Sequence, residues 1–280
     1  MSSPFNQLPN SKSNTPSLSV VVNTYNQPEY LRRVLRALDR QFAAGDELLL
    51  ADDGSGAETR DVFEGWKQPG PMRAVHVWQE HGGFRRSRIL NSAIVQAKND
   101  YLIFLDGDSV PHPKFLRDHR SLARRGFYVQ AHRAFVSEKA SRYFGLGNFP
   151  ADRMRAWISG QLQGWKHVFR WPFPFSKRRA DLRGVRGCNL AIWREDLIRV
   201  NGYNEEFVGW GREDSELALR LMNSGVHWLD VRGRAVCYHL WHPPADRSGL
   251  DQNIRMLDEA IASQRTRCRM GLDQHMTNPA

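Results

Sequence analysis

The stretch Tyr101-Leu-Ile-Phe-Leu-Asp-Gly-Asp108 decides the fold, because an apolar run of strand length ends there in two carboxylates around a glycine. Two upstream runs have the same character: Leu18-Ser-Val-Val-Val-Asn23, and Glu47 to Ala51, which leads into Asp52 and Asp53. Continuous apolar runs without alternation are typical of strands that are buried on both faces. The sequence therefore predicts a sheet whose strands end in polar residues.

Helical patterns separate these predicted strands. Apolar residues recur at helical spacing in 28–41 and again in 85–98, and a short strand is expected at 75–78. Strands that alternate with helices predict an α/β fold, Rossmann-like, with a mostly parallel central sheet flanked by helices. Ligands of such sheets gather beyond the carboxyl ends of the strands, so we expect the polar strand ends to converge on one crevice.

Composition bounds what the chain can be. Its 280 residues are 41% hydrophobic, which is enough for one catalytic domain, and no apolar run approaches the length of a membrane span. Residues 1–17 lack the pattern of a secretory signal and are expected to be a disordered leader, which points to the cytoplasm.

The spacing of the cysteines and the net charge limit the class of protein and the kind of partner further. Cys188, Cys237 and Cys268 lack paired spacing, so neither a disulfide framework nor a zinc ribbon is predicted. The net charge of +10 predicts an anionic partner, which could be nucleic acid, a phosphorylated glycolipid or an anionic membrane surface.

Asp106 and Asp108 lie on a tight turn after the buried strand, and Gly107 between them relieves backbone strain. Paired acidic oxygens suit Mg²⁺ or Mn²⁺, which keeps coordination positions open for substrate phosphates. The alternative is an acidic β-turn without a ligand, since Asp-Gly-Asp is a common turn sequence.

A second motif, Gly209-Trp-Gly-Arg-Glu-Asp214, opens a predicted helix that continues to Leu221. The helix dipole favours acids in a first turn, so capping alone accounts for Glu213 and Asp214. Capping does not account for the glycines, which suggest a backbone close to a ligand, with Trp210 as a stacking wall for a sugar. A carboxylate fixed at such a wall is placed to act as general base toward an acceptor hydroxyl.

Two further motifs could bind ligands. Along Tyr238-His-Leu-Trp-His242, alternation is expected to place both histidines on one side as metal ligands, although such pairs are also common structural hydrogen-bonding features. The stretch His81-Gly-Gly-Phe-Arg-Arg-Ser-Arg88 runs into a predicted helix and could hold a diphosphate and stack on a base. A solvated basic helix start is its alternative.

The four motifs in this order resemble the family-2 glycosyltransferases of GT-A fold, and the C-terminal half is similar to the β-1,4-galactosyltransferase and chondroitin-synthase type. The resemblance covers about 19–243, and Gly-Trp-Gly-x-Glu-Asp followed by His-Leu-Trp-His carries it most specifically. It implies one GT-A domain at 18–245, with a nucleotide-binding half at about 18–110 and a C-terminal acceptor-binding and catalytic half at about 185–245. Residues 246–280 are expected to be a C-terminal helical extension.

The resemblance also implies roles for individual residues. The nucleotide-sugar would contact a donor set: Thr24, Tyr25, Asp52, Asp53, Phe84, Arg86, Asn91 and Asp106. Mn²⁺ or Mg²⁺ would be held by Asp108 and His239, with His242 kept as a further candidate. Asp214 matches the catalytic base, and the acceptor and donor-sugar sites would include Trp210, Gly211 and Glu213.

Two features depart from the family. The galactosyltransferases have a methionine ligand three residues before the metal histidine, whereas this sequence has Val236, so the coordination sphere must differ. Residues 140–186 show no family pattern and mix aromatic residues and proline with lysine and arginine, so we expect a basic aromatic insertion that is mobile or binds a surface. This composition suits docking on an anionic membrane, or alternatively a loop that packs its aromatics into the core.

These observations predict an enzyme that moves a hexose or N-acetylhexosamine from a UDP-sugar to a glycan or glycolipid acceptor with inversion. Its expected setting is bacterial lipopolysaccharide or surface polysaccharide biosynthesis, in the cytoplasm or on the inner face of the cytoplasmic membrane. One alternative is a retaining GT-A transferase, which would share the metal site but not need Asp214 as base. The other is a nucleic-acid-binding module; it leaves the acidic and histidine motifs unexplained, so no nucleic acid is expected as a partner.

Overall fold

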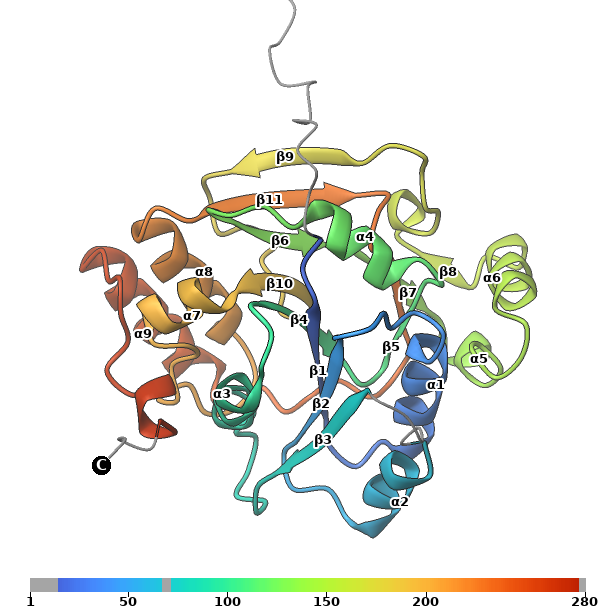
Figure 1. Cartoon of the computed structure of the whole chain (residues 1–280), viewed down its shortest axis with the longest axis horizontal. Helices are drawn as coiled ribbons and strands as arrows, with labels where there is room; N and C mark the ends of the chain where they lie inside the picture. The colour runs from blue at the N-terminus through green and yellow to red at the C-terminus, as the bar shows by residue number, and fades with distance from the viewer. Residues whose placement is uncertain (1–14, 67–71, 277–280) are drawn as a thin grey trace, which may run out of the picture.

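The protein was analysed as a computed structural model that describes residues 15–66 and 72–276. Residues 1–14 of the predicted leader lie outside these ranges. Eight strands form the central sheet in the order β3-β2-β1-β4-β10-β6-β11-β9, which runs from the bottom to the top of Figure 1. The strands are β1 (Leu18–Thr24), β2 (Glu47–Asp52), β3 (Arg73–Trp78), β4 (Tyr101–Asp106), β6 (Phe127–Ala131), β9 (Phe175–Arg179), β10 (Asn189–Trp193) and β11 (His227–Arg232).

Strand directions divide this sheet into two parts. The strands β3, β2, β1 and β4 are parallel to one another, and β6 is parallel to β11. By contrast, β10 is antiparallel to both of its neighbours, and β9 is antiparallel to β11. The predicted α/β fold with a mostly parallel sheet is therefore confirmed.

Continuous apolar runs form the central strands because both faces of the sheet are covered. Val20 and Val22 belong to one apolar core and Val21 to the other, and all three are fully buried. One core packs against α1 (Pro28–Leu38), α2 (Ala57–Trp66) and α4 (Phe115–Leu122). The other packs against α3 (Arg86–Gln96), α7 (Arg194–Val200) and α8 (Glu213–Asn223), and Figure 1 shows the two groups on either side of the sheet.

A second, small sheet continues from the carboxyl end of β4. Its order is β5-β12-β7-β8, formed by β5 (Ser109–Pro111), β12 (Cys237–His239), β7 (Arg133–Val136) and β8 (Leu162–Gln163). The antiparallel pairing of β5 with β12 sets Ser109 opposite His239. This register brings a segment from late in the chain against the Asp-Gly-Asp turn.

The region 140–186 is more ordered than its sequence suggested. It contains α6 (Phe149–Ile158), the 3₁₀ turn η1 (Trp165–His167), β8 and β9, and it follows the short helix α5 (Glu138–Ser141). Because β9 pairs with β11 across five residue pairs, the last part of this region joins the central sheet. Its expected role, a basic aromatic insertion that is mobile or binds a surface, stays a prediction.

The C-terminal segment contains α9 (Leu250–Ala262) and the 3₁₀ turn η2 (Leu272–Gln274). Helix α9 packs Leu257 and Ala260 against Leu219 of α8, so this segment lies beside the helix that opens with Glu213. Among the described residues, none of the helices combines the length and apolar character needed to cross a bilayer.

Candidate active site

The strand ends converge as the parallel sheet requires. Register sets Thr24 opposite Asp52 and Asn23 opposite Asp106. The Gly107 N–H donates to the Asn23 carbonyl at 2.8 Å, and a Cβ at position 107 would lie 2.8 Å from that same oxygen. The Asp-Gly-Asp turn therefore needs its glycine to lie this close to β1.

Asp108 meets both histidines of the Tyr-His-Leu-Trp-His motif. Its Oδ1 lies 2.9 Å from Nδ1 of His239 and its Oδ2 lies 3.2 Å from Nε2 of His242. The three ligand atoms lie within 4.8 Å of one another, as a shared metal ion requires. Burial alone would raise the pKa of Asp108, but hydrogen bonds from the two imidazoles outweigh it and hold that pKa well below its usual range.

The histidines reach one site for a different reason from the one expected. Residues three apart on a strand point to opposite faces, so alternation could not have brought them together. Instead β12 ends at His239, and the Leu240 N–H donates to the Asp108 carbonyl at 2.9 Å as the chain turns. This turn brings His242 back onto the other carboxylate oxygen.

Arg86 is the charged centre of the crevice. Its guanidinium lies 3.0 Å from Asp214, 3.6 Å from Asp106 and 3.6 Å from Glu213, and its side chain is 9% exposed. Burial would lower its pKa, but the surrounding carboxylates raise the pKa well above the ordinary arginine value. Arg86 therefore ties the end of β4 to the start of α8.

Arg133 is a second cation at this site, and it was not identified from the sequence. Its Nη1 lies 3.8 Å from the second oxygen of Asp106. Burial raises the pKa of Asp106, Arg86 and Arg133 lower it, and neighbouring Asp108 raises it, with a net upward shift. Arg133 begins β7, and no spacing in the sequence connects that strand with the Asp-Gly-Asp turn.

Asp214 is fixed by two donors. Its Oδ1 accepts from Nη1 of Arg86 at 3.0 Å, and its Oδ2 accepts from the backbone N–H of Gly187 at 2.7 Å. A Cβ at position 187 would lie 2.1 Å from Asp214 Oδ1, so only glycine fits beside this carboxylate. Gly187 was also missed from the sequence, because β10 had to be placed in the sheet before its start could be located.

Glu213 is more enclosed than its neighbour. Its side chain is 8% exposed, against 18% for Asp214, and among the described residues its Oε2 has no hydrogen-bond partner. Burial, together with the charge of Asp214, raises the pKa of Glu213 to about 7 despite the nearby Arg86. The more accessible carboxylate of the two is therefore Asp214.

The loop before α8 has a strained backbone that explains its glycines. Gly209 and Gly211 have φ of +79° and +108°, and Arg212 adopts φ +76° as the residue preceding the helix. Asn253 of α9 holds this loop by donating to the carbonyls of Val208 at 3.2 Å and Gly211 at 2.9 Å. The loop conformation thus depends on the C-terminal segment, which the motif analysis did not connect with the site.

Trp210 lies on this loop as a partly open aromatic wall. Its side chain is 38% exposed, and the guanidinium of Arg247 lies over its ring at 4.8 Å from the centroid. The preceding residue, Gly209, donates its N–H to the Phe84 carbonyl at 3.1 Å. The loop before α8 and the basic stretch that follows β3 are therefore in direct contact.

The carboxylates of Asp52 and Asp53 already bond to other groups of the protein. Asp52 is fully buried, and it accepts from the Ser55 N–H at 2.8 Å and pairs with His76 at 2.9 Å. Asp53 is 6% exposed and accepts from Gln79 at 2.5 Å and from the Arg85 N–H at 2.8 Å. These contacts fix the turn after β2, and the nucleotide contacts expected of Asp52 and Asp53 stay predictions.

Asn91 is also held by partners within the protein. Its carboxamide is fully buried on α3, donates to the Tyr203 carbonyl and to Glu205, and accepts from the Tyr203 N–H. All these partners belong to the segment before Gly209, so Asn91 holds that segment in place. Its contact with the nucleotide-sugar stays a prediction.

Exposed aromatic rings surround the donor side of the crevice. Tyr25 is 43% exposed and stacks on His81 with ring centroids 4.7 Å apart, and Phe84 is 37% exposed. Trp78, at the end of β3, is also exposed. Thr24 is buried beneath them, and its hydroxyl oxygen has no partner among the described residues. A planar base could stack in such surroundings.

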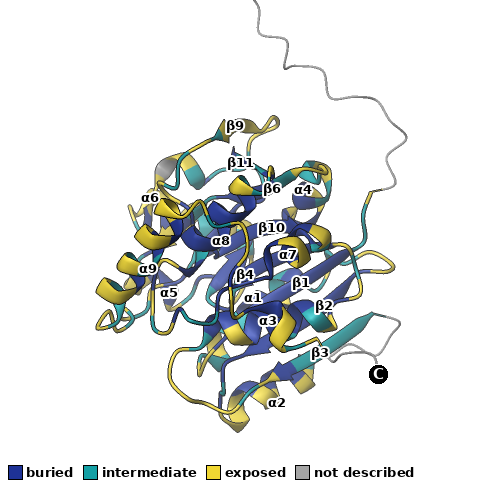
Figure 2. Ribbon diagram, turned by 90° about the vertical axis from the view of Figure 1, so that its left-hand side faces the viewer, coloured by how far each residue is buried: buried dark blue, intermediate teal, exposed yellow. Residues whose placement is uncertain are grey.

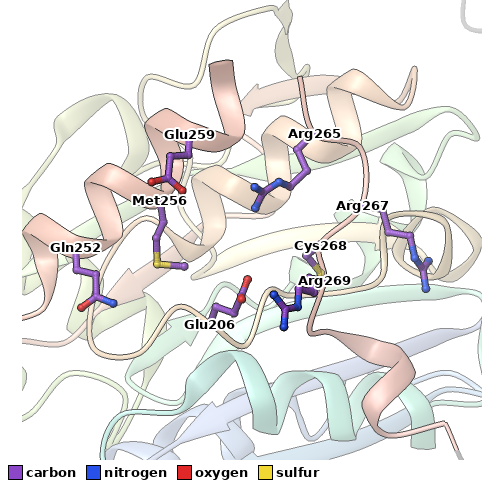
Figure 3. Close-up of a pocket in the computed structure, with 8 residues that line it drawn as sticks. All are labelled: Glu206, Gln252, Met256, Glu259, Arg265, Arg267, Cys268 and Arg269. Atoms are coloured by element: carbon purple, nitrogen blue, oxygen red, sulfur yellow. The ribbon is translucent and has the colours of Figure 1, made fainter. Parts of the chain in front are cut away.

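A cavity of about 580 Å³ lies elsewhere, between α9 and residues 265–269 (Figure 3). Glu206, Arg265 and Arg269 are among its charged lining residues, together with Met256. None of its lining residues belongs to the predicted site. The cluster at the strand ends, where the carboxylates, the histidines and Arg86 meet, remains the candidate active site.

Comparisons with known proteins are consistent with this geometry. Residues 19–195 match the family model described as glycosyl transferase family 2, and residues 169–243 match a model described as the N-terminal domain of galactosyltransferase. Chondroitin synthase of Escherichia coli is 26% identical over 252 residues, which cover 84% of this chain and 36% of that protein. Validoxylamine A glucosyltransferase of Streptomyces hygroscopicus subsp. limoneus is 29% identical over 233 residues, covering 78% and 51%. The chain thus spans about a third to a half of the length of these relatives.

Among solved structures, the mannosyltransferase PcManGT from Pyrobaculum calidifontis, in complex with GDP-Man and Mn²⁺, aligns with a TM-score of 0.55. The alignment covers 81% of this chain and 57% of that chain at 18% identity. At this identity the likeness shows the fold alone, which is that of the GT-A glycosyltransferases.

Proposed function

The chain belongs to glycosyl transferase family 2, and from this premise we propose that it moves a hexose or N-acetylhexosamine from a UDP-sugar to a glycan or glycolipid acceptor with inversion. One observation carries the proposal. Asp108 with two histidines and Asp214 with its two donors lie around the same arginine-centred crevice, at the carboxyl ends of the parallel strands. Metal ligation and base catalysis are thus available at one place.

The donor atoms of Asp108, His239 and His242 would hold the divalent cation. Their mixed oxygen and nitrogen set favours Mn²⁺, because Mg²⁺ is usually held by oxygen ligands and water. A bound Mn²⁺ neutralises negative charge on the nucleoside diphosphate that leaves. PcManGT carries Mn²⁺, which supports the proposal for this chain. In place of the methionine ligand that the galactosyltransferase resemblance would require, this chain has His242 within reach of Asp108.

Asp214 would act as the general base. Its carboxylate takes the proton of the acceptor hydroxyl as that oxygen forms a bond with the anomeric carbon, while the bond from that carbon to the diphosphate oxygen breaks. Arg86 and the Gly187 N–H orient the carboxylate for this transfer. Asp214 is preferred over Glu213 because it is the more exposed of the two.

The exposed rings of Tyr25, His81 and Phe84 would take the nucleotide base, and Trp210 would take a sugar face. Arg86 is already shared among three carboxylates, so it is assigned to positioning them and not to free contact with phosphate. Asp53 remains the donor-side aspartate proposed to meet the base or ribose.

The biological setting is proposed on the resemblance and the basic composition. The enzyme would build bacterial lipopolysaccharide or another surface polysaccharide, in the cytoplasm or peripherally on the inner face of the cytoplasmic membrane. A retaining transferase of the same fold would not need Asp214 as base, and the anomeric configuration of the product distinguishes the two reactions.

The test is a donor-hydrolysis panel with purified protein and Mn²⁺. The donors are UDP-glucose, UDP-galactose, UDP-N-acetylglucosamine and UDP-N-acetylgalactosamine, with GDP-mannose included because PcManGT binds it. Release of nucleoside diphosphate from one UDP-sugar, dependent on both Mn²⁺ and Asp108, is expected, with Asp108→Ala as the control. Release from GDP-mannose alone would overturn the choice of nucleotide. Silence across the panel, with no UDP binding by calorimetry, would overturn the proposed function.

A further inference from the structure

An aromatic edge borders the molecule far from the crevice. We give this name to Trp171, Phe173, Phe175, Lys177 and Arg178, which lead into and form β9 at the end of the central sheet. In Figure 1 β9 is the uppermost strand, and in Figure 2 most of it is coloured as exposed. The opposite end of the same sheet is β3, on the nucleotide side.

The backbone of this edge is held in place. The Trp171 N–H donates to the Gly233 carbonyl at 2.8 Å, and its ring packs on Gly233, where a Cβ would lie 2.6 Å from the indole. Arg234 donates to the Pro172 carbonyl, and β9 pairs with β11 along its whole length. The edge is therefore a fixed part of the surface and not a free loop.

The aromatic side chains of this edge project into solvent. Trp171 is 48% exposed, Phe173 79% and Phe175 63%. The Trp171 and Phe175 rings lie edge to face with their centroids 6.4 Å apart, and Phe173 lies between them in the chain at a bend. Phe169, two residues before Trp171, packs against Trp157 of α6 with the ring centroids 5.1 Å apart, and Trp157 is itself exposed. Large rings gathered on a surface in this way are costly to leave in water and mark an interaction site.

The charges along this segment of the sequence are of one sign, and the acids that contact it from other elements are buried. Asp230 of β11 lies opposite Lys177 and pairs with His132 and Arg179, and Asp118 pairs with Arg170. From 153 to 180 the sequence has no Asp or Glu, and its basic residues are Arg153, Arg155, Lys166, Arg170, Lys177, Arg178 and Arg179. Lys177 is exposed and has no ion pair among the residues described, and Arg178 donates to the ring of His227. The next acid along the chain, Asp181, is already paired with Arg179 and Arg183. The partner of this edge should therefore be anionic and should accept aromatic rings.

A second copy of the chain is the wrong partner for this edge. Two copies of β9 pairing side by side would bring Lys177, Arg178 and Arg179 against the same cations, and basic residues on an edge strand oppose such pairing. An anionic bilayer satisfies both features, because aromatic rings settle at the headgroup level and lysine and arginine are drawn to acidic lipid.

We propose that the aromatic edge docks the protein on an anionic phospholipid bilayer, with Phe173 and Phe175 in the interfacial layer and Lys177 and Arg178 against lipid phosphates. This inference deepens the peripheral-membrane part of the proposed function by naming the surface that binds. Because the edge lies at the far end of the sheet from β3, the nucleotide side would remain open to the aqueous phase during docking.

The test is co-flotation of the full chain with vesicles. Vesicles of phosphatidylcholine with about one third phosphatidylglycerol are compared with vesicles of phosphatidylcholine alone, at low salt and at high salt. Partition is expected to be about tenfold stronger on the anionic vesicles and to fall severalfold at high salt. Equal binding to both vesicle types, or none to either, would overturn the proposal.

Variants assign the binding to this surface. Phe173→Ser/Lys177→Glu should lose about tenfold in partition on anionic vesicles, and Phe173→Trp should keep wild-type binding. The control Ile261→Ser/Arg60→Glu makes the same chemical changes at exposed positions on α9 and α2, and should bind as the wild type does. Equal losses in both double variants would overturn the assignment.

Three further measurements address the rival partners and the folding of the variant. Binding of a single-stranded DNA that is weakened by Phe173→Ser/Lys177→Glu, with vesicle binding unchanged, would replace lipid by nucleic acid. A dimer in light scattering that this variant abolishes, without vesicle binding by the wild type, would replace lipid by a second copy. Donor hydrolysis by the variant should match the wild type and shows that it is folded. Because flotation needs no turnover, an inactive wild type that still floats would refute only the proposed reaction.

Discussion

Two strands that flank β1 in the sheet, β2 and β4, each end in a pair of aspartates, and the two pairs have different partners. Asp52 and Asp53 follow β2, and Asp106 and Asp108 follow β4, and both strands are buried on both faces. The first pair bonds to its own turn, to β3 and to the stretch after it. The second pair meets two arginines and two histidines that come from distant parts of the chain.

The difference lies in the chemistry of the partners. Backbone N–H groups, the amide of Gln79 and the imidazole of His76 satisfy the first pair and fix the shape of a turn. Two guanidinium groups and two imidazoles on a single carboxylate surround the second pair, and such groups can be shared with an anionic ligand or a metal ion. Position at a strand end is therefore common to both pairs, while the arginines and the doubled imidazole distinguish the second.

Among the substitutions that test this difference between the two pairs, Asp108→Ala is expected to have the largest effect on turnover. Asp108→Ala should reduce metal-dependent donor turnover about a thousandfold or more, because it removes the carboxylate that both histidines face. We expect Mn²⁺ to raise the melting temperature of the wild type and to leave that of Asp108→Ala unchanged. Turnover assays and thermal melts with and without Mn²⁺ measure both. Asp61→Ala, at an exposed carboxylate on α2, is the control, and wild-type turnover in Asp108→Ala would contradict the metal assignment.

The next effect is expected at Asp214, on the other side of Arg86. Asp214→Asn should lower turnover by about a hundredfold to ten-thousandfold with little change in the affinity for UDP, because only the proton acceptor is lost. Steady-state kinetics and UDP calorimetry measure the two quantities. Asp251→Asn changes an acid in the first turn of α9 and should be nearly silent. If both variants lost activity only slightly, Asp214 would be no more than a helix-capping acid.

A smaller effect, of a different kind, is expected for the structural pair. Asp52→Asn should lower the free energy of unfolding by about 2–3 kcal/mol, because a fully buried carboxylate then loses charge-assisted bonds to Ser55 and His76. Mn²⁺ binding should not change. Urea denaturation and Mn²⁺ titration test this prediction. Undiminished stability together with lost nucleotide binding would make Asp52 a ligand residue and remove the contrast between the two pairs.

The smallest effect concerns pH. Because the pKa of Glu213 is raised from 4.5 to about 7, the folded state holds this proton more tightly than the unfolded state, and stability from this group is lost as pH rises through that interval. Glu213→Gln has no such proton. Its stability relative to the wild type should therefore increase by about 1–2 kcal/mol between about pH 5 and about pH 8. Urea denaturation at the two values measures this, and a pH-independent difference would contradict the raised pKa.

The sequence predicted the parallel half of the fold and the motifs of the candidate site because both depend on residues that are close together in the chain. Continuous apolar runs predicted β1, β2 and β4, and glycines beside acids indicated the Asp106 turn and the loop before Asp214. Arg133, Gly187 and Asn253 were missed because each acts only through tertiary register. Nothing near Gly187 in the sequence indicates that β10 enters the sheet antiparallel between β4 and β6.

Local pattern also hid the surroundings of two features. Asn91 lies in a basic stretch of the sequence, and it is on the buried side of α3. The stretch 140–186 looked irregular because proline and aromatic residues hide one short helix and one edge strand, and β9 has the charged sequence of an edge and not the apolar run of a central strand.

The pairing of β5 with β12 has a consequence for how the protein is made. Synthesis delivers Asp108 early, but His239 and His242 only after almost all of the central sheet has left the ribosome. A nascent chain can therefore fold its parallel strands while the group of Asp108, His239 and His242 is still incomplete. Any activity that depends on this group can begin only late in synthesis, after residue 242 has been added.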